Sequence, residues 1–144
     1  MSICEPESSE DFKRYYFLRW KILRKPLDLP LGSERDDIED KAIHLMVCKK
    51  DRIPIAVGRL HFNSDEEAQI RFMAVDERYQ GKGIGTMLLK ELERRARENG
   101  ARYVVLNARE SVINFYRKNG YFAVGKPFVL LETIYHLKMK KFLY

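Results

Sequence analysis

The chain has 144 residues, of which 45% are hydrophobic and 33% charged, and its net charge is +6. This size and composition predict one compact domain over residues 1–144, with a core that needs neither disulfides nor structural metal. No apolar run approaches the roughly 20 residues that span a bilayer, and no signal peptide is recognisable, so we predict a cytoplasmic protein. The basic residues are scattered among acidic and apolar positions, which argues against nucleic acid or a membrane as a partner.

The two cysteines, Cys4 and Cys48, are far apart in the sequence and form no Cys-x-x-Cys motif. Neither a disulfide framework nor a zinc site is indicated, and we predict two free thiols and no metal.

The first half of the chain predicts a helix followed by a sheet. Ser8 is followed three residues later by Asp11, a pairing typical of a helix N-terminus, and apolar residues then recur at helical spacing to about Arg24. Segments rich in Val, Ile and Leu, separated by polar turns, then predict an antiparallel meander of strands at residues 43–49, 53–62 and 68–75.

The second half predicts a parallel crossover and a closing hairpin. An apolar stripe at helical spacing begins at Ile84 and ends at Asn99-Gly100, a typical helix C-cap. The apolar run 102–107 predicts a strand covered on both faces, parallel to the strand before the helix. A second helix is expected at 111–118, with strands near 121–124 and 132–140. The predicted fold class is α/β with a mixed sheet.

Residues 70–86 form the most informative segment, because an apolar strand passes through glycines at 81, 83 and 85 directly into a helix. Glycines allow a tight turn and close approach of the backbone to a ligand, while the first N–H groups of the helix attract an anion. The spacing fits neither a dinucleotide fingerprint, which needs glycine at Thr86, nor a Walker A loop.

The spacing Gln80-x-x-Gly83-x-Gly85 resembles motif A of the GNAT N-acetyltransferases, and the order of elements resembles their fold over roughly residues 8 to 141. The resemblance implies that loop amides hold the pyrophosphate of acetyl-CoA, the co-substrate, and that pantetheine pairs with the splayed strand. Lys82 either adds charge to the phosphates or points to water, and Asn107 either contacts pantetheine or holds the strands. The implied cofactor-binding residues are Met73, Ala74, Val75, Gln80, Gly81, Lys82, Gly83, Ile84, Gly85, Thr86 and Asn107.

Residues 111–122 resemble motif B of the same family, which implies that Tyr116 protonates the departing thiolate. The alternative is a core tyrosine whose hydroxyl meets a backbone carbonyl. Residues 106–109 and 134–139 resemble a small bacterial ElaA/YjcF-like subgroup, which favours His136 as a catalytic residue over His44 and His61 without fixing its role. Strand alternation places Glu132 on the same face as His136.

The sequence therefore predicts an N-acetyltransferase acting by direct attack of a primary amine, carried by a small molecule or a peptide, on acetyl-CoA. No cysteine placement argues for a covalent enzyme intermediate. Three acids after the first helix, Glu34, Asp36 and Asp37, either select a cationic amine or are surface charge. The alternative function is a non-catalytic module that binds or senses acyl-CoA. The oligomeric state is open, a homodimer included.

Overall fold

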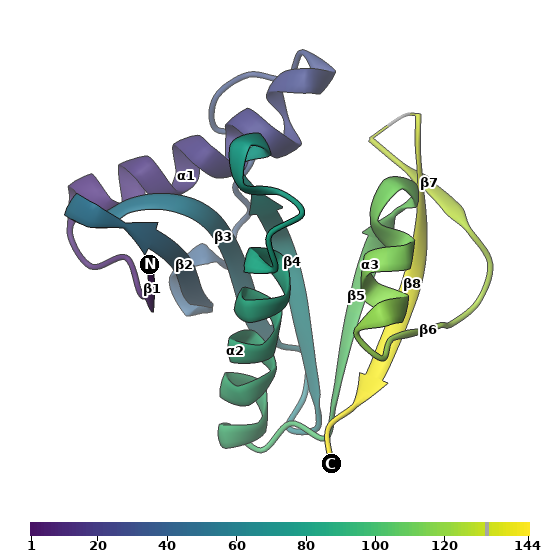
Figure 1. Cartoon of the computed structure of the whole chain (residues 1–144). Helices are drawn as coiled ribbons and strands as arrows, with labels where there is room; N and C mark the ends of the chain where they lie inside the picture. The colour runs from purple at the N-terminus through teal and green to yellow at the C-terminus, as the bar shows by residue number, and fades with distance from the viewer. Residues whose placement is uncertain (132) are drawn as a thin grey trace.

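The protein is described by a computed structural model that covers residues 1–131 and 133–144. Its strands form one sheet in the order β1-β2-β3-β4-β5-β8-β6, with β7 paired to β8 (Figure 1). The strands are β1 Ser2–Cys4, β2 Ile43–Lys49, β3 Ile53–Phe62, β4 Glu67–Val75, β5 Tyr103–Arg109, β6 Phe122–Ala123, β7 Phe128–Leu130 and β8 Ile134–Phe142. The α-helices are α1 Ser9–Leu23, α2 Ile84–Glu98 and α3 Ile113–Lys118. Short 3-10 turns lie at η1 Lys25–Leu27, η2 Glu39–Lys41, η3 Lys50–Arg52, η4 Glu77–Tyr79 and η5 Glu110–Val112.

The predicted element order is confirmed. Ser8 caps α1 by accepting a hydrogen bond from the Asp11 N–H at 3.0 Å, and the Asp11 carboxylate accepts one in return from the Ser8 N–H. β2, β3 and β4 pair antiparallel, as the meander required, and β4 and β5 pair parallel on either side of α2.

The structure adds details that the sequence did not predict. β1 and β7, each of three residues, were missed, and residues 111–118 begin with the η5 turn before α3. β1 pairs with β2, so the sulfur atoms of Cys4 and Cys48 lie 3.1 Å apart despite their distance in sequence, and both remain free thiols. Glu132, placed in the last strand by the sequence, lies outside the described residues.

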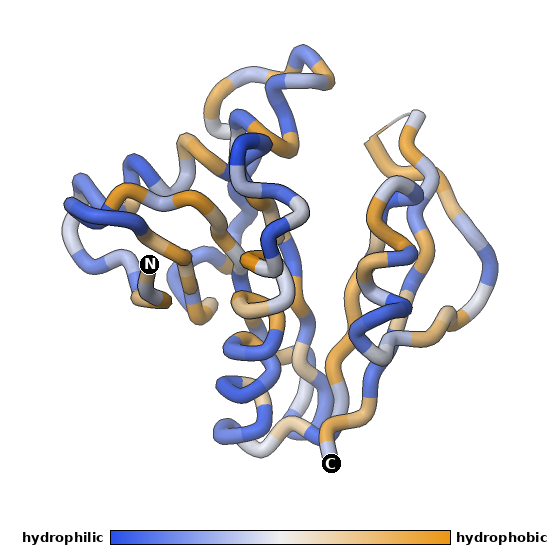
Figure 2. The backbone as a smooth tube through the Cα atoms, in the orientation of Figure 1, coloured by the Kyte–Doolittle hydropathy of each residue, from blue (hydrophilic) through white to orange (hydrophobic). Residues whose placement is uncertain are grey.

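Helices cover both faces of the sheet. α2 and α3 pack on one face, where the larger apolar core includes Leu88, Leu92 and Tyr116, and α1 packs on the other through Tyr15 and Leu18. Figure 2 shows hydrophobic strands between these layers and hydrophilic residues along the last turns of α2. Within the described residues, no helix is long and apolar enough to cross a membrane.

The sheet opens between its two parallel strands. Glu67–Gln69 of β4 pair with residues 103–105 of β5, and beyond them the two strands diverge into the V visible in Figure 1. On the other side of β4, two residues, Phe72 and Met73, lie opposite the single Gly58 of β3. This is a β-bulge, and Phe72 takes the left-handed conformation with φ of 56°. The bulge bends β4 at the opening of the V.

An ionic network lies buried between α1 and the sheet. The Glu39 carboxylate accepts hydrogen bonds from Arg19 at 2.9 Å and from Arg59 at 2.8 Å, and both guanidiniums are fully buried. Arg59 also contacts Asp36 at 2.6 Å. Charges buried this deeply are tolerated because each has an opposite charge within hydrogen-bond distance. Together with Arg71 of β4, which also pairs with Asp36, the network holds residues 36–39 against α1, β3 and β4.

We expect Arg59→Met to destabilise the protein by about 3 kcal/mol, because it removes one buried partner from each of two carboxylates, Glu39 and Asp36. The matched control is Arg14→Gln, since Arg14 pairs with Glu10 on the surface and its loss should change stability by less than about 1 kcal/mol. Urea unfolding of both variants measures the difference. Equal losses in the two variants would show that the network contributes no special stability.

Candidate active site

A cavity of about 860 Å³ occupies the V between β4 and β5. Its walls are residues 70–75 of β4 and 106–109 of β5, the strand segments beyond the last β4–β5 pair. The glycine loop and α3 line it on one side, and the C-terminal end of α1, residues 22–24, lines it on the other. Because α1 and α2 cover opposite faces of the sheet, the cavity reaches both faces and brings them together at the opening of the strands.

The glycine loop presents a series of unused hydrogen-bond donors. The backbone N–H groups from Gly81 to Thr86 have no acceptor in the described part of the chain, and the first helical bond, from Met87 to Gly83, begins after them. The first N–H groups of a helix have no acceptor within the helix and are free to bind a ligand. At the positive end of a 15-residue helix they form a site for an anion such as a pyrophosphate.

Glycine is required in this loop for conformation. Gly81 and Gly83 have φ of 77° and 82°, which L side chains rarely adopt, and Gly83 is the N-cap of α2. The Gln80 side chain donates from Nε2 to the Val75 carbonyl at 3.0 Å and so ties the loop to the end of β4. A Cβ at Gly85 would lie 3.2 Å from the Phe115 ring, so the small residue there also brings α2 close to α3.

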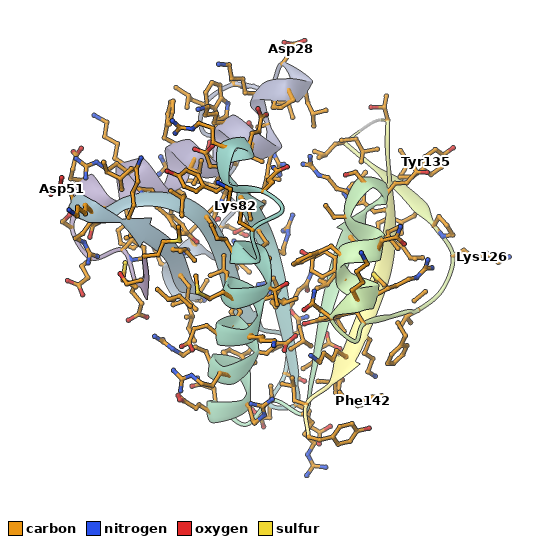
Figure 3. The ribbon with its side chains drawn as sticks, in the orientation of Figure 1. Asp28, Asp51, Lys82, Lys126, Tyr135 and Phe142 are labelled. Atoms are coloured by element: carbon orange, nitrogen blue, oxygen red, sulfur yellow. The ribbon has the colours of Figure 1, made fainter. Side chains whose placement is uncertain are left out.

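Most of the predicted cofactor-binding residues line the cavity; Lys82 and Ile84 do not. Lys82 is exposed on the loop before α2, where Figure 3 labels it, and its Nζ lies 5.6 Å from the centroid of the Tyr79 ring. The Ile84 side chain is buried in the core, so Ile84 offers the cavity no more than its N–H. The predicted residues that line the cavity are Met73, Ala74, Val75, Gln80, Gly81, Gly83, Gly85, Thr86 and Asn107.

Tyr116 lies at the meeting point of the two walls. Its side chain is 7% exposed, and its hydroxyl points at the Met73 sulfur, 3.9 Å away across the cavity. Burial raises the pKa of this phenol. Tyr116 is therefore a neutral O–H donor at physiological pH. Tyr116 belongs to the apolar core, as the alternative from the sequence expected, but no backbone carbonyl in the described residues accepts its proton.

His136 lies in the cavity wall on β8. It is 5% exposed, and its ring stacks on Phe128 at 6.0 Å. Its Nδ1 lies 2.9 Å from the Ile134 carbonyl, and because a carbonyl only accepts, Nδ1 carries the proton and Nε2 of the neutral ring has a lone pair. Burial lowers the pKa of His136, the Ile134 carbonyl raises it, and the charges of Arg109 and Arg24 lower it further. The net shift is downward, so the ring is neutral at pH 7.

The other two histidines lie outside the cavity. His44 is held between the Tyr15 hydroxyl at 2.9 Å and the Glu39 carbonyl at 2.7 Å, and burial lowers its pKa. His61 contacts Arg59 at 3.3 Å. Both belong to the network under α1.

The acids expected near the acceptor also lie outside the cavity lining. The Glu34 carboxylate is buried and accepts hydrogen bonds from the Gly32 N–H and Arg35. Burial alone would raise the pKa of Asp36, but hydrogen bonds from Arg59 and the Ile38 N–H lower it to about 2. Arg71 lines the cavity and also pairs with Asp36 at 3.1 Å. Glu34 and Asp36 therefore neutralise arginines, and Asp37 is an exposed surface charge, so the alternative that these acids select a cationic amine gains no support.

Among the cavity residues that the sequence did not single out are Arg24, Phe72 and Arg109. The sequence places Arg24 at the end of the first helix and Arg109 in the segment that resembles the bacterial subgroup, and it indicates no role in the site for either. Their convergence depends on the fold, because the hydrogen bond between Arg109 and Leu23 joins residues 86 positions apart.

Comparison with known proteins supports the same reading of the fold and loop. A model of the acetyltransferase (GNAT) family matches residues 7–121. The chain is 27% identical over 135 residues to the uncharacterized N-acetyltransferase YjcF of Bacillus subtilis, a match that covers 94% of this chain and 95% of that protein.

Solved structures share the fold. A putative N-acetyltransferase from Lactobacillus plantarum superposes with a TM-score of 0.88 at 21% identity, covering 99% of this chain and 98% of that one. A GNAT family acetyltransferase from Elizabethkingia anophelis, solved with acetyl-CoA bound, superposes with a TM-score of 0.75 at 16% identity, covering 99% and 97% of the two chains.

Proposed function

Because this chain belongs to the acetyltransferase (GNAT) family and is an acyl-CoA-dependent N-acetyltransferase, we propose that it transfers an acetyl group directly from acetyl-CoA to a primary amine. The observation that carries the proposal is the row of unpartnered N–H groups from Gly81 to Thr86, which opens into the same cavity as Tyr116 and His136. Acetyl-CoA supplies an activated acyl group as a thioester. The chain supplies its binding, its orientation and two proton-transfer groups.

Binding of the co-substrate follows from the backbone. The N–H groups of the glycine loop bind the pyrophosphate, and the open edge of β4 beyond Gln69 pairs with the amide groups of pantetheine. A backbone N–H of Val75 or Met73 donates to the thioester carbonyl and stabilises the negative charge that its oxygen acquires. No side chain is needed for that stabilisation.

Proton transfer is assigned to the two side chains in the wall. The amine nitrogen attacks the carbonyl carbon, a C–N bond forms, and the C–S bond breaks. His136 accepts the proton lost by the amine at Nε2, and Tyr116 donates its hydroxyl proton to the sulfur that leaves. The roles match the neutral states of both groups, since a neutral imidazole is a base and a neutral phenol is an acid.

The proposal is tested by calorimetry with acetyl-CoA, followed by a thiol-release assay against amines, amino acids, polyamines and peptides. We expect binding and amine-dependent release of CoA. Binding without release across the panel would favour the sensing module instead, and absence of binding would refute the assignment of the glycine loop.

Gly83→Ala should weaken CoA binding about tenfold, equal to roughly 1.4 kcal/mol, because a side chain at positive φ shifts the loop amides. Gly100→Ala is the matched control. Gly100 has φ of 89° and open space around its Cβ, but it lies beyond the opposite end of α2. Both variants should lose similar stability on heating, and calorimetry should find weakened CoA binding in Gly83→Ala alone. Equal CoA affinities would contradict the amide cradle.

Tyr116→Phe should lower kcat by about 100-fold, the effect typical of losing a general acid, while CoA affinity stays within about twofold. Tyr121→Phe is the control, because its hydroxyl donates to Glu93 at 2.8 Å in the core and Tyr121 does not line the cavity. Steady-state kinetics and calorimetry give the two quantities. An unchanged kcat in Tyr116→Phe would refute the acid role.

The pH profile of kcat/KM should have an acid limb, a fall in activity toward low pH, that lies below pH 6.5. The reason is that burial lowers the pKa of His136 and the ring acts as a base only when it is deprotonated. Activity carried by His136 is therefore present above the lowered pKa and lost as pH falls through it. His136→Gln should reduce kcat/KM and remove this limb, whereas His61→Gln should retain it. A limb that persists in His136→Gln would assign the base to another group.

A further inference from the structure

Two arginines converge at the α1 end of the cavity. Arg24 donates from Nη1 to the Leu23 carbonyl at 3.2 Å, and Arg109 donates from Nη2 to the same oxygen at 2.9 Å. Two positive charges thus meet at one neutral oxygen. Leu23 is the last residue of α1, so its carbonyl carries part of the negative end of the helix dipole, which offsets about half of one charge.

Neither guanidinium has a carboxylate partner among residues 1–131 and 133–144. The acids of the segment after α1 have other partners: Glu34 pairs with Arg35, Asp36 with Arg59 and Arg71, and Glu39 with Arg19 and Arg59. Glu110, next to Arg109 in the chain, is exposed and forms no ion pair among the described residues. Arg24 is 7% exposed, and its remaining hydrogen bond, from Nε, reaches the Ser33 carbonyl at 3.2 Å. Its Nη2 and the Nε and Nη1 of Arg109 make no hydrogen bond to the described residues.

The surroundings confirm an excess of positive charge. Burial lowers the pKa of Arg24, and the charges of Arg109, Arg71 and Arg19 lower it further against a smaller opposing effect of Glu34. The guanidiniums of Arg19, Arg59 and Arg71 lie 4.4 to 4.8 Å from the Phe72 ring centroid, with Arg24 at 5.6 Å. An aromatic face attracts cations but carries no net charge, so it leaves the excess uncompensated.

The arginines lie beside the proposed base. Arg109 on β5 is the direct register partner of His136 on β8. Side chains of directly opposed residues project from the same face of a sheet, about 5 Å apart at Cβ. An acceptor whose nitrogen approaches His136 therefore places its neighbouring atoms next to the unpaired donors of Arg109 and Arg24.

We propose that the acceptor is a small primary amine that also carries an oxyanion, a carboxylate or a phosphate, which Arg24 and Arg109 bind beside His136. This inference rests on the proposed function and names the class of its acceptor. Guanidinium groups match both oxyanions in geometry and charge, and a polyamine would meet repulsion at this end of the cavity.

The first test compares pairs of acceptors in which one member carries an oxyanion and the other does not. Glycine and β-alanine are assayed against glycinamide and β-alaninamide, and phosphoethanolamine against ethanolamine. We expect kcat/KM to be at least tenfold higher for the anionic member of a pair. The amides have the less basic amines, so intrinsic reactivity at neutral pH opposes the expected order. The two arms distinguish a carboxylate from a phosphate, and equal or reversed preference in both would overturn the proposal.

The second test changes the site. Arg109→Gln should raise KM for the preferred anionic amine roughly 10- to 100-fold, the effect of one charge-assisted hydrogen bond, and leave KM for acetyl-CoA within about twofold. Arg102→Gln is the control, because that side chain is 78% exposed at the opposite end of β5. Thermal unfolding identifies any variant that fails to fold, and Arg109→Lys, which retains the charge, should recover part of the loss. An unchanged KM in folded Arg109→Gln would overturn the proposal.

A binding measurement separates this inference from the proposed reaction. The protein with CoA, which has no acetyl group to transfer, is titrated with β-alanine and with β-alaninamide in a calorimeter. Binding of β-alanine alone, lost in Arg109→Gln, supports the oxyanion site even if no amine gives thiol release. Thiol release with neutral or cationic amines alone would support the reaction and refute the oxyanion site.

Discussion

The early end of pairing between β4 and β5 is the constraint on which the site depends. Three residues of each strand pair, and beyond them the backbone edges of both walls face a cavity. Unpaired strand edges and helix-terminal N–H groups cost free energy unless something occupies them. The open edge of β4 and the N-terminus of α2 both present unused N–H donors to the cavity, so one ligand can bind to both. In the proposed complex, backbone groups bind the co-substrate, and side chains carry the proton transfers and the selection of the acceptor.

The two ends of the cavity differ in the chemical groups that create their positive potential. At the glycine loop, positive potential comes from N–H groups and the α2 dipole, and the nearby Lys82 lies outside the cavity lining. At the α1 end it comes from guanidiniums on α1, β4 and β5. The buried network of Arg19, Glu39 and Arg59 bears on this second end, because it neutralises Glu39 and Asp36 and leaves Arg24 and Arg109 to the cavity.

The sequence predicted the parts of this design that are local in the chain. β2 and β3 match their predicted bounds because Val- and Ile-rich runs with polar turns determine them within a few residues. The glycine loop was recognisable for the same reason. β1 and β7 are too short to show a period, and they exist through pairing with β2 and β8. The arginine pair was missed because no local pattern links the end of α1 to the end of β5. The pairing of Asp36 with Arg59 and Arg71 could not be predicted either, because those partners are distant in sequence.

Arg109 also joins the two sides of the cavity. At the closed end of the V, β4 and β5 are joined by sheet pairing, and near the open end the hydrogen bond from Arg109 to Leu23 joins β5 to α1, which packs on the β4 side. The two sides of the cavity are thus connected at both ends, by backbone pairing at one end and by a side-chain hydrogen bond at the other. Any separation of β5 from α1 at this end would break or lengthen that hydrogen bond.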